Sequence, residues 1–427
     1  MRLRFNSRFH LKRVHIEEVM LMISILLGCR SVFMQANPYF VYAVVTISSV
    51  LSIMCVAIRK GAVLSKKLLS TMFVYLLIVS IVTIIVKNTS NGPFIISYWI
   101  LVPLMLLYFL LLSYQEKMDW LKLFSDVIFV FIVLSTISWL IGPIFHWIQP
   151  THTLEINWGG IKTYNGYLLC YKVVGKGIKN YFGFNFLTND SIYVEAPITN
   201  VIYSLGYALY LFVKKDRNKI KEIIYIFAMI TTMSATSVLL AAILFALRRI
   251  INSIETDNKC FIDFLKKYIF PLIIVIVACI AVSVILKIKA NDDYGNYYAH
   301  TYALKSGFIS WLSKPIDGYG YELGQEFYNT TSGLFKILVH GGIVFGLLYV
   351  IPFISSIVFA IEEKDFGLAI FCVLSFVLLI LVIWHYSPAY MFVLAFEYSF
   401  MMDEIRQGHI AKKRGYLRYD TIKTRTF

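Results

Sequence analysis

Residues 223–247 read IIYIFAMITTMSATSVLLAAILFAL, and this stretch decides how the chain must be arranged. Five lysines and arginines lie within 214–221 just before it, and Arg248 and Arg249 follow it directly. Basic flanks favour the cytoplasmic side of a membrane, so both ends of the stretch are expected on that side. Two full helical crossings would need about 40 residues, which is more than the stretch contains. We therefore predict a hairpin of two short helices over 223–247.

The predicted break of this hairpin is polar and falls in 231-TTMSAT-236, which contains Ser234 and Thr236. Lipid cannot satisfy the backbone groups of a broken helix, so protein or water must cover such a break. We expect the break to line a cavity that opens toward the outer face. The alternative is a single span with one flank assigned to the wrong side.

The rest of the chain is equally apolar, since 59% of its 427 residues are hydrophobic and only 15% are charged. A soluble domain of this length needs a more charged surface. Apolar runs long enough to cross a membrane recur along the sequence. We predict an all-α polytopic membrane protein, a single integral membrane domain over 1–427 with about 12 transmembrane helices when the hairpin counts as two. The other predicted spans are 17–35, 38–58, 68–86, 94–113, 122–145, 191–213, 268–287, 333–360, 366–385 and 387–403.

The basic residues give the orientation of these spans. Twenty-nine of the 40 lysines and arginines fall on the face that carries both termini, which the positive-inside rule assigns to the cytoplasm. The other 11 lie on the opposite face and in the spans, mostly in two long extracytoplasmic loops, 146–190 and 288–332. The net charge of +15 therefore reflects topology and does not indicate nucleic-acid binding. The six cysteines show no CxxC spacing, so neither a disulfide framework nor a metal site is predicted.

Ionisable residues inside spans are costly and often functional. Glu195 lies in 191-SIYVEAPITN-200, where the first long loop meets the next helix; the alternative role is stabilisation of that helix N-terminus. Lys336 and His340 are one helical turn apart and share a face. For Lys336 the alternative is snorkelling to the interface, and for His340 a structural role is the better interpretation. The remaining candidates are Arg30, Glu397 and His385, the last also interpreted as structural.

The two long loops share a composition of many aromatic residues among lysines. Aromatic faces suit the C–H faces of sugars, and lysines suit phosphate groups as point charges. An interfacial aromatic belt explains some of these residues. It does not explain loops of this length with glycine-rich turns such as 317-DGYG-320, because long loops are usually functional. No glycine-rich nucleotide-binding motif is present, so any glycosyl donor is expected to be lipid-borne.

Four motifs together resemble the O-antigen polymerase and O-antigen ligase superfamily over about 120–400. The first is 193-YVEAP-197, which is similar to an aromatic-x-Glu-Pro motif, and the second is 231-TTMSATSVLLA-241 in the hairpin. The third is 311-WLSKPIDGYGYELG-324, similar to a Pro-Ile-x-Gly-x-Gly signature, and the fourth is the helix 334-LFKILVHGGIVFGLLYVIP-352. Where the ligase branch has a His-Asn pair, this chain has 329-NTTS-332, which favours the polymerase branch.

The resemblance implies an inverting, metal-independent glycosyl transfer from a polyprenyl-pyrophosphate-linked oligosaccharide, without a cofactor. Members typically carry arginines near three of the motifs, and here those places read 187-LTND-190, Ala235 and the neighbourhood of His300. The pyrophosphate must then be held by other groups, which we rank as His300 and Lys305 first, Lys336 next and Arg30 last. The implied catalytic residues are Glu195 and His300, and the implied substrate-binding residues are Arg30, Tyr193, Ser234, Thr236, Lys305, Lys314, Tyr319, Tyr321 and Lys336.

The sequence thus predicts a polymerase that joins lipid-linked repeat units into a surface polysaccharide, at the outer face of a bacterial cytoplasmic membrane. An O-antigen ligase is the nearest alternative. A transporter or flippase of lipid-linked glycan is an alternative from another class, but such proteins are typically built from repeated halves, and no repeat is visible here. Expected partners are the lipid-linked oligosaccharide, membrane lipid, and flippase and chain-length regulator proteins.

Overall fold

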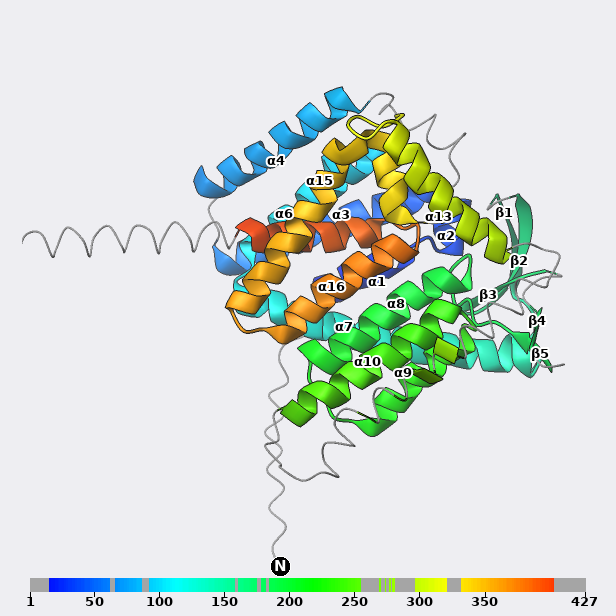
Figure 1. Ribbon diagram of the computed structural model, residues 1–427. Coiled ribbons are helices and arrows are strands. Elements are labelled where there is room, and N and C mark those ends of the chain that lie inside the picture. The colour runs from blue at the N-terminus through cyan, green and yellow to red at the C-terminus, as the bar shows by residue number, and fades with distance from the viewer. Residues whose placement is uncertain are drawn as a thin grey trace, which may run out of the picture.

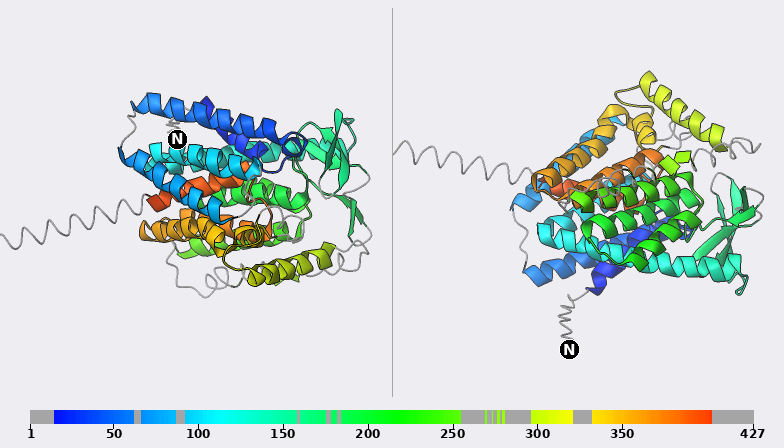
Figure 2. Two further views of the ribbon diagram at one scale, coloured as in Figure 1. Left: turned by 90° about the horizontal axis from the view of Figure 1, so that it is seen from above. Right: turned by 60° about the horizontal axis from the view of Figure 1, so that its bottom comes forward.

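The computed structural model describes residues 15–61, 66–86, 92–157, 160–174, 178–181, 184–254, 296–320 and 332–402, with a few single positions between 269 and 280. It is a bundle of helices with strands at one end (Figures 1 and 2). The helices are α1 (Ile16–Leu27), α2 (Val32–Ala36), α3 (Pro38–Lys60), α4 (Lys66–Ile85), α5 (Gly92–Ile95), α6 (Val102–Leu111), α7 (Tyr114–Trp139), α8 (Ala196–Ala208), α9 (Lys219–Thr231), α10 (Ala235–Ile254), α13 (Asn296–Ser313), α15 (Gly333–Glu362), α16 (Phe366–Leu381) and a last helix over 388–402. Three π-helical stretches continue or precede them: η1 (Ile96–Leu101), η2 (Leu140–Ile144) and η3 (Leu209–Val213).

The bundle is that of a multi-pass membrane protein. Five described helices are long and apolar enough to cross a bilayer: Pro38–Lys60, Leu68–Ile85, Tyr114–Ile144, Ala196–Val213 and Gly333–Glu362. Ile96–Leu111 and Phe366–Leu381 are shorter apolar helices. The total of 12 spans stays a prediction, because the expected span 268–287 lies largely outside the described residues.

The helix formed by α8 and η3 is the centre of the bundle. Over Ala196–Val213 94% of the residues are buried, because α7, α9, α10 and α16 all contact this helix. Its polar side chains are satisfied internally, as the hydroxyl pair of Ser135 and Tyr203 at 2.8 Å shows. A helix enclosed on every side holds its N-terminus in a fixed place, and that N-terminus carries Glu195.

The hairpin breaks where the sequence predicts it. Helix α9 ends at Thr231 and α10 begins at Ala235, with Met233 in the left-handed region at φ 49°. Both helices extend beyond 223–247 into the basic flanks, so α10 is longer than predicted. Near the other end of the hairpin, the Arg248 guanidinium donates to the carbonyl oxygens of Leu211 and Asp216, close to the start of α9. The two basic flanks therefore lie at the same end of the bundle.

The first long loop is more ordered than the sequence suggests. Strands β1 (His152–Asn157), β2 (Ile161–Tyr167) and β3 (Cys170–Val173) form an antiparallel sheet in that order, and β4 (Ile178–Tyr181) pairs with β5 (Phe184–Leu187). The second long loop contains the 18-residue helix α13, which packs against α15. The all-α class therefore holds for the bundle, and the first loop adds two small sheets to it.

The prediction of one continuous span over 17–35 is wrong. Helix α1 ends at Leu27 and α2 begins at Val32, with Arg30 between them at φ 51°. Two tertiary contacts explain the break. A Cβ on Gly28 would lie 2.6 Å from Pro388 Cβ, and the Val32 amide donates to the Ile192 carbonyl oxygen at 2.8 Å. The chain thus leaves the helix to pair with the end of the first long loop.

Candidate functional site

Two helix breaks meet the end of the first long loop at the end of the bundle that carries the strands, which we call the loop end (Figure 1). Ser31, between α1 and α2, forms an antiparallel bridge with Tyr193 at the end of the first long loop. The Asn189 amide of the same loop donates to the Thr231 carbonyl oxygen at the hairpin break, at 2.9 Å. Broken helices at membrane depth occur where protein or a water-filled cavity satisfies the freed backbone, and transporters build substrate sites from them.

The polar residues of the hairpin break face the start of α8. The Asn200 side-chain amide donates to the Thr236 hydroxyl at 3.2 Å, and the hydroxyls of Ser234 and Thr236 are 2.8 Å apart. The Asn189 side chain adds a bond to the Thr231 hydroxyl. The predicted residues Ser234 and Thr236 are therefore held one turn from the α8 N-terminus, within a network of hydroxyl and amide groups.

Glu195 occupies the N-cap position of α8, in an extended conformation at φ −161° and ψ 154°. Its carboxylate makes no capping hydrogen bond, although at this position it still lies at the positive end of the α8 dipole. The side chain is half-buried, and the preceding residue, Val194, donates its amide to the Arg30 carbonyl oxygen at 3.5 Å. This pairing brings the backbones of Glu195 and Arg30 next to each other.

Tyr164 of β2 closes the site from the side of the sheet. Its hydroxyl donates to the Val194 carbonyl oxygen at 3.0 Å. Burial, together with the carboxylates of Asp190 and Glu195, raises the pKa of the Tyr164 phenol. The hydroxyl therefore stays protonated and remains a donor, which fixes the backbone immediately before Glu195.

Two cations, Lys336 and Arg30, lie at the loop end. Lys336 lies in the first turn of α15 and is 4% exposed. Arg30 lies close enough to act on the Lys336 ammonium electrostatically. A phosphate or a similar anion bound here would interact favourably with both charges.

Two histidines, His340 and His385, lie near Lys336 and Arg30. His340 Nδ1 is 2.8 Å from the Tyr386 hydroxyl, and the two rings are stacked. His385 is 1% exposed, interacts electrostatically with both Arg30 and Lys336, and neither of its ring nitrogens has a hydrogen-bond partner among the described residues. The described protein groups do not satisfy the His385 ring, so its interpretation as a structural histidine stays a prediction. A buried polar group without a partner is costly, so a ligand or water is expected at this imidazole.

The glycine-rich loop docks on a break in α15 and so joins the third and fourth motifs. The amides of Tyr319 and Gly320 donate to the carbonyl oxygens of Val339 and His340, both at 2.8 Å. At the break Gly342 has φ 59°, and a Cβ there would lie 2.1 Å from the Ile316 carbonyl oxygen. Only glycine fits this approach, which positions His340 directly beside the loop.

The remaining predicted residues are placed less centrally. Lys305 is exposed on α13, and Lys314 pairs with Asp317 at 3.5 Å while lying over the Tyr319 ring. Tyr193 is buried, and its hydroxyl has no hydrogen-bond partner among the described residues. His300 belongs to α13, but its side chain and all of Tyr321 lie outside the described residues.

Sequence reasoning underrated His385 and the segment 382–388 that carries it. This segment interrupts the helices before 388–402, and its Tyr386 carbonyl oxygen accepts hydrogen bonds from Tyr42 and Ser97. The dipeptide Ser387-Pro388 was the available signal, because proline restricts the residue before it to non-helical conformations. In the described part of the chain no group of three His, Cys, Asp or Glu side chains could hold a metal ion.

No family model, curated protein or solved structure matches this chain. The resemblance to the O-antigen polymerase and ligase superfamily therefore depends on the four motifs alone.

Proposed function

We propose that this protein is a glycosyltransferase that polymerises lipid-pyrophosphate-linked oligosaccharide repeat units. One observation carries the proposal: Arg30 acts electrostatically on the buried Lys336 ammonium, and the Arg30 carbonyl oxygen pairs with the Val194 amide next to Glu195. Paired cations suit a pyrophosphate, and an adjacent carboxylate suits a proton acceptor for a sugar hydroxyl. The aromatic loops would contact the sugars.

The proposed reaction is a direct displacement. The acceptor hydroxyl gives its proton to Glu195 as its oxygen forms a bond to C1 of the donor sugar. The bond from C1 to the pyrophosphate oxygen breaks, and polyprenyl pyrophosphate leaves with the electron pair. Negative charge grows on the leaving group in the transition state, where the cations stabilise it. Attack from the face opposite the leaving group inverts C1.

The placement of the cations changes the order of the expected phosphate contacts. Lys305 is exposed on α13, whereas Lys336 is buried and acted on by Arg30. A charge in a low-dielectric place interacts more strongly with a phosphate than an exposed one does. We therefore place Lys336 and Arg30 before Lys305 and His300.

The proposed location is the cytoplasmic membrane of a bacterium, with both termini in the cytoplasm and the loop end outside. A ligase would use the same geometry with another acceptor, and a flippase would hold the same lipid without breaking a bond. Cells that lack the protein distinguish the three. A polymerase mutant still attaches single repeat units to the surface, a ligase mutant attaches none, and a flippase mutant keeps the precursors inside.

The test is Glu195→Gln in purified protein supplied with lipid-linked repeat units. A general base typically contributes about 10²–10⁴-fold, so polymer formation should fall by that factor while thermal stability is unchanged. Glu155→Gln is the matched control, because Glu155 is exposed on β1 at the same end of the molecule. Polymer of near-normal length and yield from the Glu195 variant would remove this assignment.

A further inference from the structure

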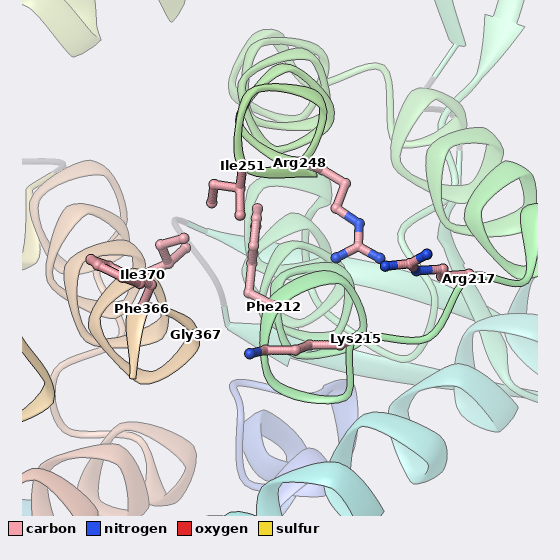
Figure 3. Close-up of a pocket in the computed structure, with 8 residues that line it drawn as sticks. All are labelled: Phe212, Lys215, Arg217, Arg248, Ile251, Phe366, Gly367 and Ile370. Atoms are coloured by element: carbon pink, nitrogen blue, oxygen red, sulfur yellow. The ribbon is translucent and has the colours of Figure 1, made fainter. Parts of the chain in front are cut away.

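A second group of cations lies at the opposite end of the bundle, where α9 begins, which we call the basic end. A pocket with a cavity volume of about 80 Å³ opens there between α10, η3 and the start of α16. Three basic residues line one half of it: Lys215, Arg217 and Arg248. Figure 3 shows the side chains of Arg248 and Arg217 reaching toward one another. Two guanidinium groups that converge in this way repel each other unless an anion lies between them.

The carboxylates nearby are engaged elsewhere. Asp126 pairs with Lys214 and Lys221, and Asp216 accepts from the Asn218 amide and pairs with Lys221. At the start of α16, Asp365 accepts from the helix amides of Gly367 and Leu368 and from the Tyr114 hydroxyl. Among the described residues no ion pair joins Lys215, Arg217 or Arg248 to a carboxylate.

Hydrogen bonds to the protein orient the Arg248 guanidinium and leave some of its N–H donors available. Its guanidinium donates to the Leu211 carbonyl oxygen at 2.8 Å and to the Asp216 carbonyl oxygen at 3.4 Å, and the residue is 9% exposed. A guanidinium has five N–H donors, so these two bonds orient it without exhausting it. Oriented arginines are well suited to bind phosphate oxygens.

The other half of the pocket is apolar and formed by Phe212, Ile251, Phe366 and Ile370. Gly367 lets α16 approach η3 closely, since a Cβ there would lie 2.2 Å from the Phe212 carbonyl oxygen. Phe366 is 64% exposed and lies on the α16 side of the pocket, across from the two arginines (Figure 3). A soluble phosphate has no hydrocarbon that could pack on these apolar side chains. The ester of a membrane lipid carries hydrocarbon directly next to its phosphate.

We propose that this pocket binds the phosphate of an anionic phospholipid. The phosphate lies between Arg217 and Arg248 with Lys215 beside it, and the first methylenes of the acyl chains run over Ile370 and Phe366. The cavity holds the headgroup phosphate only, so the chains lie outside it along α16. The bound lipid fastens the open end of the α9–α10 hairpin to α16. Basic pockets between transmembrane helices on the cytoplasmic side are known to select such headgroups.

The test uses the full-length protein in a neutral detergent, titrated with phosphatidylglycerol or phosphatidylcholine. Native mass spectrometry counts the lipid that stays bound, and thermal unfolding reports the stabilisation. We expect phosphatidylglycerol to be retained over phosphatidylcholine, and Arg217→Gln to weaken its binding about fivefold, the effect of one basic charge near a lipid phosphate. The double variant Lys215→Gln/Arg217→Gln should weaken it about 25-fold on the same basis.

Lys219→Gln is the matched control, because Lys219 is exposed at the start of α9, outside the pocket, and its loss changes the net charge equally. Wild-type retention in this variant supports a defined site. An equal loss in the Lys219 and Arg217 variants would mean a diffuse surface attraction and overturn the proposal. It would also fail if inorganic phosphate alone gave the same stabilisation and displaced the lipid, or if neither lipid were retained over the other.

Discussion

Two buried lysines at the loop end differ in the charged groups that lie near them. Lys172 of β3 is 5% exposed, and its ammonium donates to Asp190 and to the Thr188 carbonyl oxygen, both at 2.7 Å. Lys336 of α15 is buried to the same degree, and the cation Arg30 is among the charges that act on it. The Lys172 region pairs its ammonium with a carboxylate. The Lys336 region brings a second cation near the first, which suits the binding of an anion.

The largest expected effect concerns the Lys172 region and stability. Lys172→Met leaves Asp190 buried without its cation, and breaking a buried pair costs about 3–5 kcal/mol in the free energy of unfolding. Chemical denaturation in detergent measures this loss. Activity per folded molecule should stay close to wild type. The double variant Lys172→Met/Asp190→Leu should recover part of the stability, and no recovery would mean that the pair is not the cause.

The Lys336 region should respond in the opposite way. Lys336→Gln removes a buried charge on which Arg30 acts unfavourably, so the free energy of unfolding should fall much less than in Lys172→Met. Turnover should drop about a hundredfold, equivalent to about 3 kcal/mol of lost transition-state stabilisation. Lys305→Gln is the matched control, since Lys305 is exposed at the same end. If the Lys305 variant lost turnover and the Lys336 variant did not, the two residues would have to exchange roles.

A smaller effect is expected from the kink of α15 that supports the Lys336 region. Gly342→Ala places a Cβ in a backbone conformation and a space that only glycine fits, at a cost of about 1–3 kcal/mol in the free energy of unfolding. Gly346→Ala on the same helix meets only the Leu338 side chain, which can move, so it should cost less. Equal losses in the two variants, measured by thermal unfolding, would show that the glycine-rich loop does not depend on the kink.

The smallest effect is expected beside Lys172. The Tyr171 hydroxyl lies 2.7 Å from His152 Nε2, and His152 is exposed, so water can replace this bond. Tyr171→Phe should therefore cost only about 0.5–1.5 kcal/mol in the free energy of unfolding. Tyr167→Phe, on the neighbouring strand, is the control. A loss as large as that of Lys172→Met would mean that the Tyr171 hydroxyl, and not only the ion pair, holds the sheet.

Sequence patterns within single segments predicted part of the fold. Hydropathy located several of the described apolar helices, and the basic flanks of 223–247 predicted the break that lies between Thr231 and Ala235. The motif around Glu195 placed that residue at the start of α8. These features follow from the composition of single segments and their neighbours.

The rest depends on contacts between distant segments. The stretch 17–35 is apolar on both sides of Arg30, and only the pairing with Ile192 and the contact of Gly28 with Pro388 explain its break. Likewise, nothing near Lys172 or Lys336 in the sequence tells which has a carboxylate beside it and which has a cation. Asp190 lies 18 residues from Lys172 in the sequence, whereas Arg30 lies in the break between α1 and α2, far from Lys336 in the sequence.

The central claim is that Arg30 and Lys336 hold the pyrophosphate of a lipid-linked donor. A structure of the protein with a polyprenyl-pyrophosphate-linked oligosaccharide bound tests it most directly. The account predicts pyrophosphate oxygens within hydrogen-bond distance of both the Arg30 guanidinium and the Lys336 ammonium, with an acceptor hydroxyl at Glu195. Pyrophosphate bound instead at the exposed lysines of α13 and the glycine-rich loop, with Arg30 and Lys336 out of reach, would contradict it.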